Sequence, residues 1–326
     1  MSKRNDSIDI LKFLAVLLII NSHADILYPS NLKILATGGA IGDCLFLFIS
    51  GFTLSMKNRD SFIGWYKRRI NRIYPSVFTC AFVASLIYRH NYISIWQLLG
   101  GEFIIAIMTY YILLFLINRY IPDKINFILG IVIIFTVISY WIWYPYKLDV
   151  SKGIYSIATL FRWIPYFAFM LIGAIMGKNS EEKTMHVGGF DICTLLLSVV
   201  LFYGIQKAGV SNPVINSWQI ITVFPLIGII FYLYRVCNMQ IILRVYDRIT
   251  AVKKLVLIVG GVCLESYLIQ FSLFSDKFNS IFFPFNLVLN VLIILIVAYL
   301  CRCCARFFSQ TFSNQPYNWN NIIKLY

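Results

Sequence analysis

The segment "IDILKFLAVLLIINSHAD", residues 8–25, carries ionisable side chains at both ends of an apolar run. His23 follows Lys12 by eleven residues, so at about 100° per residue the two share one helix face, about 16 Å apart along the axis. Asp9 lies on the same face and can pair with Lys12. A neutral imidazole, with a pKa of about 6.5, is suited to abstract a hydroxyl proton. The pattern predicts acid–base chemistry at membrane depth.

The same residues also have a purely structural interpretation. Asp9 and Lys12 would then be interfacial anchors, with the Lys12 ammonium group extended toward water. For His23 we favour the chemical interpretation, because it follows ten uncharged residues. A carboxylate would help to orient the imidazole, and Asp25 and Asp43 are the candidates.

Two later segments carry further polar groups. In "GDCLFLFISGFTLS", residues 42–55, Gly51 follows Ser50 and permits close approach of another helix. The segment "WYKRRINRIYP", residues 65–75, is basic and contains Lys67, Arg68, Arg69 and Arg72. These four side chains either anchor the chain at the cytoplasmic surface or bind the phosphates of a cytosolic ligand.

Three more ionisable residues are predicted within or beside apolar segments. We expect Glu102 and Arg162 near the outer boundary and Glu265 deeper, beside Ser266 and Gln270. A buried carboxylate needs a partner, and Arg162 could supply one to Glu265 if their helices meet. Ser50, Glu102, Arg162 and Glu265 are therefore the predicted substrate-binding or structural polar network.

Composition indicates that lipid surrounds the helices that position these groups. Hydrophobic residues make up 60% of the 326 residues and charged residues only 13%, whereas soluble domains have roughly 45–50% and about 25%. One water-soluble core cannot bury so much apolar surface. The sequence predicts an all-α, polytopic integral membrane protein, with one domain over residues 1–326 and a short cytoplasmic tail over about 302–326.

Ten apolar segments are candidates to cross a hydrocarbon core of ~30 Å, for which a helix needs about 20 residues. The predicted spans are 9–27, 42–56, 73–88, 103–121, 125–144, 159–177, 190–207, 217–236, 255–275 and 286–301. The segment 237–254 is predicted to be an amphipathic interfacial helix. No cleavage pattern of small residues follows the first span, so we expect it to remain in the mature protein.

The net charge of +14 fits either nucleic-acid binding or an excess of basic residues in cytoplasmic loops. With a cytoplasmic N-terminus, 20 of the 28 basic residues fall on the cytoplasmic side and six on the other, while Lys12 and Arg162 lie inside spans. Topology therefore explains the excess. Both termini are predicted to be cytoplasmic, and no nucleic-acid partner is expected.

The eight cysteines lie along apolar runs or near predicted cytoplasmic ends, which indicates reduced thiols. The "CRCC" of residues 301–304 could bind a metal ion or carry palmitate. It lacks a partner pair of His or Cys residues. No metal is therefore expected.

In their order along the chain, these segments resemble the membrane acyltransferase-3 family. Lys12 followed after ten residues by His23 resembles the family's R-x10-H signature, "FLFISGFTLS" resembles its F-F-x-x-S-G-F/Y segment, and "WYKRRINRIYP" resembles its R-x-x-R-x-x-P stretch. "FRWIPYFAFMLIGAIMG" (161–177) and "ESYLIQ" (265–270) resemble later segments more loosely. Lys12 stands where Arg is commoner, which loses the bidentate fork, and Gln270 stands where many members have His.

The resemblance implies an O-acetyltransferase that takes an acetyl or other short acyl group from acetyl-CoA or another acyl-CoA. The acceptor would be a hydroxyl of a cell-surface polysaccharide or a lipid-linked glycan of the cell envelope. The protein would lie among the lipids of the bacterial inner membrane. His23 would be the general base or a transient acyl carrier, with Lys12 and Asp9 positioning the donor. The phosphates of CoA would bind Lys67, Arg68, Arg69 and Arg72.

A membrane flippase or exporter of a glycan or lipid, without acyl-transfer chemistry, is the alternative. Ten spans with buried charges would also suit a transporter. Inverted repeats or paired broken helices would favour that class. The sequence has no evident inverted repeat, so we favour the acyltransferase.

Overall fold

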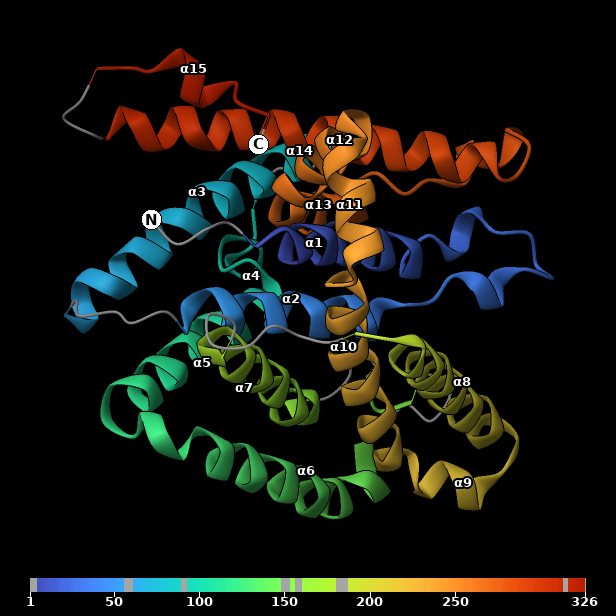
Figure 1. Ribbon diagram of the computed structural model, residues 1–326. Helices are drawn as coiled ribbons and strands as arrows, with labels where there is room; N and C mark the ends of the chain where they lie inside the picture. The colour runs from blue at the N-terminus through green and yellow to red at the C-terminus, as the bar shows by residue number, and fades with distance from the viewer. Residues whose placement is uncertain are drawn as a thin grey trace. The chain divides into compact units, whose positions relative to one another are not determined.

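The computed structural model describes residues 5–55, 61–88, 93–147, 153–155, 160–179, 187–312 and 316–325. These residues form helices and no β-strand (Figure 1), which confirms the all-α prediction. The longer helices are α1 (Asp6–Ser22), α2 (Gly39–Leu54), α3 (Phe62–Tyr88), α5 (Gly101–Tyr120), α6 (Ile125–Lys147), α7 (Trp163–Asn179), α8 (Gly189–Ser211), α10 (Val223–Cys237), α12 (Thr250–Gly261), α13 (Cys263–Ile269) and α14 (Phe285–Thr311). The shorter ones are α4 (Ile95–Leu98), α9 (Pro213–Ser217), α11 (Gln240–Arg248) and α15 (Trp319–Ile322).

Each predicted span coincides with a helix, but the helices differ in length. Among the described residues, seven are long and apolar enough to cross a membrane, or eight if α12 and the bent segment Cys263–Ser272 form one span. α1 and α7 have only 17 residues each, fewer than the about 20 that a crossing needs. The count of ten therefore stays a prediction, as does the orientation. The predicted interfacial helix is divided, because α11 ends at Arg248 and α12 begins at Thr250.

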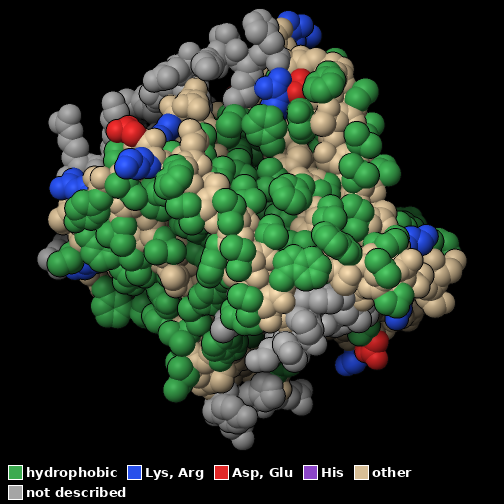
Figure 2. Space-filling model, turned by 90° about the horizontal axis from the view of Figure 1, so that it is seen from below, with side chains coloured by type: hydrophobic (Ala, Val, Ile, Leu, Met, Phe, Trp, Pro, Cys, Tyr) green, Lys and Arg blue, Asp and Glu red, His purple; other side chains and the backbone are tan. Residues whose placement is uncertain are grey.

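Apolar side chains cover the outside of several helices. On α6, Phe127 and Ile134 expose 67% and 62% of their surface, and on α8 Val200 exposes 66%. Figure 2 shows a face on which hydrophobic side chains form a broad layer and charged side chains lie toward its edge. Exposed apolar area of this extent is unfavourable in water. It fits a lipid environment.

The chain divides into two compact units, and three of the boundaries between them fall within α1, α2 and α5. Unit 1 consists of Met1–Leu11, Asp43–Asn58 and Ile112–Ile249. Unit 2 consists of Lys12–Gly42, Arg59–Tyr111 and Thr250–Tyr326. In unit 1, α6 packs on α7 and α8 packs on α10, whereas in unit 2 α3, α13 and α14 pack together.

Within unit 1, α2 and α7 meet backbone to backbone. A Cβ atom on Gly51 would lie 1.9 Å from the carbonyl oxygen of Met170. A Cβ atom on Gly173 would lie 2.0 Å from the carbonyl oxygen of Phe48. Only glycine fits at such a crossing, so the prediction that Gly51 permits close helix approach is confirmed.

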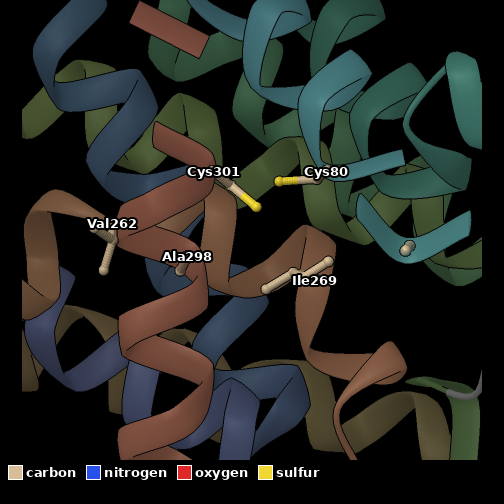
Figure 3. Close-up of a cluster of buried hydrophobic side chains, with 6 residues drawn as sticks. Cys80, Val262, Ile269, Ala298 and Cys301 are labelled. Carbon is tan, nitrogen blue, oxygen red and sulfur yellow. The ribbon is translucent and has the colours of Figure 1, made fainter. Parts of the chain in front are cut away.

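Small side chains also form the centre of unit 2. Cys80 of α3, Ile269 of α13, and Ala298 and Cys301 of α14 are buried in one cluster with Val262. Figure 3 shows the sulfur atoms of Cys80 and Cys301 directed toward one another. All eight cysteines lie among the described residues and are free thiols. The small volumes let the three helices approach closely.

The last turn of α1 is held by its neighbours in unit 2. A Cβ atom on Gly42, in the first turn of α2, would lie 2.5 Å from the Ile19 side chain. Asn21 donates hydrogen bonds to the carbonyl oxygens of Leu35 and Thr37, at 2.8 and 2.9 Å. These contacts hold the end of α1 in place, and with it the backbone of His23, the residue that follows the helix.

The basic segment lies on α3 rather than ahead of it. We predicted a span from residue 73, whereas α3 begins at Phe62 and continues through Pro75. Proline lacks the N–H that would bond to the preceding turn. The helix nevertheless continues, and the Thr79 hydroxyl donates to the Pro75 carbonyl oxygen at 2.8 Å. Residues 67–72 therefore project from a continuous helix.

Gly51→Ala is expected to disrupt the packing of α2 on α7. The added methyl group would meet backbone atoms, so the helices must separate at a cost of at least about 2 kcal/mol. The thermal midpoint of the protein purified in detergent should fall by several degrees. Gly130→Ala on α6 is the control, because nothing lies within 4 Å of its Cβ position. Equal midpoints for the two variants would contradict the backbone contact.

Candidate active site

His23 is the first residue after α1, and its half-buried ring packs on an aromatic ring. Its backbone N–H donates to the carbonyl oxygen of Ile20 at 3.2 Å. The centroids of the His23 and Phe271 rings are 4.5 Å apart, with the ring planes inclined by 57°. The Tyr88 hydroxyl of α3 donates to the Phe271 carbonyl oxygen at 2.7 Å. The imidazole therefore lies beside the short helix η7 (Gln270–Ser272).

Lys12 lies three turns before His23, about 16 Å along the helix axis. It is half-buried and within electrostatic range of Cys263 at the start of α13. Asp9, only 4% exposed, is one turn nearer the N-terminus of α1. Lys12 and His23 therefore lie beside opposite ends of the segment Cys263–Ser272.

Glu265 of α13 is a buried carboxylate, with 6% of its surface exposed. The Ser76 hydroxyl of α3 donates a hydrogen bond to it at 2.6 Å. Arg302 and Arg306 of α14 act on it electrostatically. These partners belong to unit 2, whereas Arg162, the partner that the sequence suggested, lies in unit 1.

Arg302 is a site residue that the sequence did not identify. The sequence places it at the start of a tail, but α14 continues to Thr311 and carries it. Its Nη1 atom is buried without a hydrogen-bond partner among the residues that the structure describes. Gly261, the last residue of α12, makes room for it, because a Cβ there would lie 2.7 Å from Nη1. Arg72 of α3 is within electrostatic range of Arg302.

The four basic residues of α3 have unequal environments. Lys67, Arg68 and Arg72 are exposed, whereas Arg69 is half-buried. The guanidinium carbon of Arg69 lies 5.4 Å from the centroid of the Trp65 ring, a cation–π contact. Three of the four predicted phosphate ligands are therefore accessible to a mobile anion, and Arg69 is restrained by Trp65.

The other predicted residues occupy separate positions. Ser50 is buried on α2, and Arg162 is half-buried at the end of the short helix η5 (Leu160–Arg162), both in unit 1. Arg162 acts electrostatically on Tyr166, whose hydroxyl donates to Asp43 at 3.5 Å. Glu102 is half-buried in the first turn of α5, where a helix N-terminus favours an anion. The predicted four-residue network is thus divided between the two units.

Unit 2 combines two chemical elements along one helix. Near one end, Arg302 and Arg306 of α14 act on the Glu265 carboxylate, Arg72 of α3 is within range of Arg302, and Lys12 of α1 is within range of Cys263. An imidazole lies at the other end. The cations exceed the carboxylate in number, so the first element can bind an anion. The second can transfer a proton. Among the described residues, no group of three or more His, Cys, Asp or Glu side chains could hold a metal ion.

These features define a multi-pass, all-helical membrane protein with ionisable side chains buried between its helices. A family model described as an acyltransferase domain matches residues 5–305, nearly the whole chain. The chain therefore belongs to the acyltransferase-3 family, as its motifs predicted, and is an acyltransferase. Searches of curated proteins and of solved structures gave no match.

Ser76→Ala is expected to destabilise the protein. The buried Glu265 carboxylate would lose a hydrogen-bond donor, at a cost of about 1–3 kcal/mol. Thr79→Ala is the matched control, because that hydroxyl bonds within α3. Adding Glu265→Gln to Ser76→Ala should restore part of the thermal midpoint, since a neutral amide is easier to bury. Equal midpoints for the two single variants would contradict a structural role for the Ser76–Glu265 bond.

Proposed function

We propose that the protein transfers an acetyl or other short acyl group from acyl-CoA to a hydroxyl of a cell-surface polysaccharide or lipid-linked glycan. It would do so in the bacterial inner membrane. Family membership supplies acyl transfer. One observation supports the finer assignment most: the segment Cys263–Ser272 has Lys12 near its start and His23 at its end.

The shape and charge of acyl-CoA suit the placement of Lys12 and His23. Acyl-CoA carries its phosphates on the nucleotide and its thioester at the far end of the pantetheine arm. The separation of about 16 Å between Lys12 and His23 is of the order of that arm's reach. The phosphates would bind at Lys12, Arg72 and Arg302, with exposed Lys67 and Arg68 extending the basic surface. Asp9 would orient Lys12 from the preceding turn.

His23 would act as the general base. Its imidazole takes the proton of the acceptor hydroxyl while the hydroxyl oxygen attacks the thioester carbonyl carbon. When the tetrahedral intermediate collapses, the carbon–sulfur bond breaks and the CoA sulfur takes the proton from the imidazolium. A positioned base contributes about 10²–10⁴-fold to such a step.

Transient acyl transfer to His23 is the other possible role. An imidazole nitrogen would attack the thioester and release CoA, and the acceptor hydroxyl would then take the acyl group from the acyl-imidazole. The two roles differ in one observable. Only the carrier role places an acyl group on the protein itself.

His23→Ala should reduce turnover of radiolabelled acetyl-CoA by about 100-fold or more, because the base or carrier is lost. Release of labelled acetate by the purified protein measures turnover, and Lys12→Ala should chiefly raise the KM for acetyl-CoA. Label on the wild type that disappears in His23→Ala would indicate the carrier role. A folded wild type that neither binds nor turns over any short acyl-CoA would refute the assignment of the donor.

Arg72→Ala should raise the KM for acetyl-CoA by about tenfold, the value of one charge-assisted hydrogen bond. The KM for acetyl-pantetheine, which lacks the phosphates, should not change. Arg119→Ala, an exposed arginine at the end of α5, is the matched control. Equal effects on the two donors would place Arg72 outside the phosphate site.

An exporter remains the second candidate because of one observation. α12 and the segment Cys263–Ser272 form a helix pair bent by 53°, and transporters bind substrates at broken helices, typically in pairs. One such bent pair occurs among the described residues. The variant His23→Ala separates the two classes. An acyltransferase would lose surface acyl esters while glycan export continued, whereas an exporter would lose both or neither.

A further inference from the structure

Three buried side chains around the end of the bent helix pair have polar atoms without a hydrogen-bond partner among the described residues. The unpaired atoms are both amide atoms of Gln270, the hydroxyl of Ser266 and the Oδ1 atom of Asn290. These residues are 0%, 1% and 0% exposed. Native proteins leave few buried polar atoms unpaired, and ordered water or a ligand usually accounts for the exceptions.

Helix spacing and hydrogen bonds to the backbone connect the three residues. Gln270 follows Ser266 by four residues, so the two lie one turn apart on one helix face. Leu273 connects them to α14. Its N–H donates to the Gln270 carbonyl oxygen at 3.0 Å, and its own carbonyl oxygen accepts from Asn290 Nδ2 at 2.9 Å. The unpaired atoms thus come from the segment Cys263–Ser272 and from the adjoining α14, both in unit 2.

This group lies on the side of α13 that faces α1. Gln270 lies two turns after Cys263, and therefore on the same face, and Cys263 is in electrostatic range of Lys12. The next residue, Phe271, packs on His23. Ile269, about 100° from Gln270 around the helix axis, belongs to the cluster in Figure 3. Along this segment, Gln270 therefore lies between Cys263, which is near Lys12, and Phe271, which packs on His23.

The unpaired atoms include donors as well as acceptors. The Gln270 amide and the Ser266 hydroxyl can do both, whereas Asn290, whose Nδ2 is engaged, offers an acceptor. A thioester carbonyl only accepts, so it cannot satisfy Asn290. A hydroxyl group donates and accepts, and adjacent sugar hydroxyls could use all three side chains.

We propose that Gln270, Ser266 and Asn290 form a hydroxyl-binding subsite that holds the acyl acceptor beside His23. The inference rests on the proposed function for the reaction and adds the residues that bind the acceptor. Within that reaction, these side chains position the attacking hydroxyl, while His23 takes its proton.

The test uses Gln270→Met, which keeps the length of the side chain and removes both polar atoms. An apolar replacement should not lower the thermal midpoint, because the amide has no protein partner to lose. Gln206→Met on α8 is the matched control, a half-buried glutamine whose Nε2 donates to the Phe202 carbonyl oxygen at 3.2 Å. Ser266→Ala is a second, smaller change in the same subsite.

Two reactions are followed with radiolabelled acetyl-CoA. The first is acetate release by purified protein, and the second is label transfer to the glycan and glycolipid fraction of membranes that contain the protein. Gln270→Met should keep the release rate and the KM for acetyl-CoA within about twofold and lose transfer by at least about tenfold. Ser266→Ala should lose transfer to a smaller extent, and Gln206→Met should keep both reactions.

Three results would contradict the proposal of a hydroxyl-binding subsite. Unchanged transfer would mean that buried water satisfies these atoms, and a raised KM for acetyl-CoA would assign them to the pantetheine amides. A lowered midpoint would indicate structural partners. If Gln270→Met did not fold, unchanged transfer by Ser266→Ala would overturn the proposal equally. Failure of the proposed function is distinct, because the wild type would then release no acetate, and the subsite would fall with it.

Discussion

The burial of one carboxylate governs the assembly of unit 2. Removing Glu265 from water is expensive unless hydrogen bonds and opposite charge compensate. α3 therefore brings Ser76 to it and α14 brings Arg302. The same three helices meet through the small side chains around Cys80 and Cys301 (Figure 3), so polar and apolar contacts require the same register. The arginines outnumber the carboxylate, and the positive charge that remains is what an anionic donor would meet.

The bend between α12 and α13 orients this site. It follows the pair Gly260–Gly261, and glycine pairs are common places for helix kinks. The Val262 N–H contacts two carbonyl oxygens, those of Ile258 and Val259, at 3.3 and 3.2 Å. Beyond the bend, Glu265 meets α3 and Phe271 meets His23. The irregular turn at Val262 thus leads into a segment that contacts both the basic cluster around Glu265 (Arg302 and Arg306) and the His23 imidazole. Gly261 also leaves the space that Arg302 occupies.

Hydropathy was sufficient to predict the helical class and a helix at each apolar segment. It could not predict which helices meet, so Ser76 and Arg302 were missed as partners of Glu265. Two predicted helix ends were wrong for the same reason: α3 begins at Phe62 rather than at residue 73, and α14 continues past residue 301. A signal for that continuation was present, because Ala298, Cys301 and Ala305 are small residues at helical spacing, and all three are buried.

The unpaired polar atoms beside α1 affect both the stability of the protein and its proposed activity. Each buried donor or acceptor without a partner costs about 1–3 kcal/mol, so apolar side chains at Gln270 and Ser266 would give a more stable helix. A ligand that pairs with these atoms recovers that free energy on binding, and only where its hydroxyls match their geometry. Active sites commonly contain groups that lower the stability of the fold but are needed for activity. The polar atoms would then favour the acceptor specifically, while the basic cluster around Glu265 discriminates by charge alone.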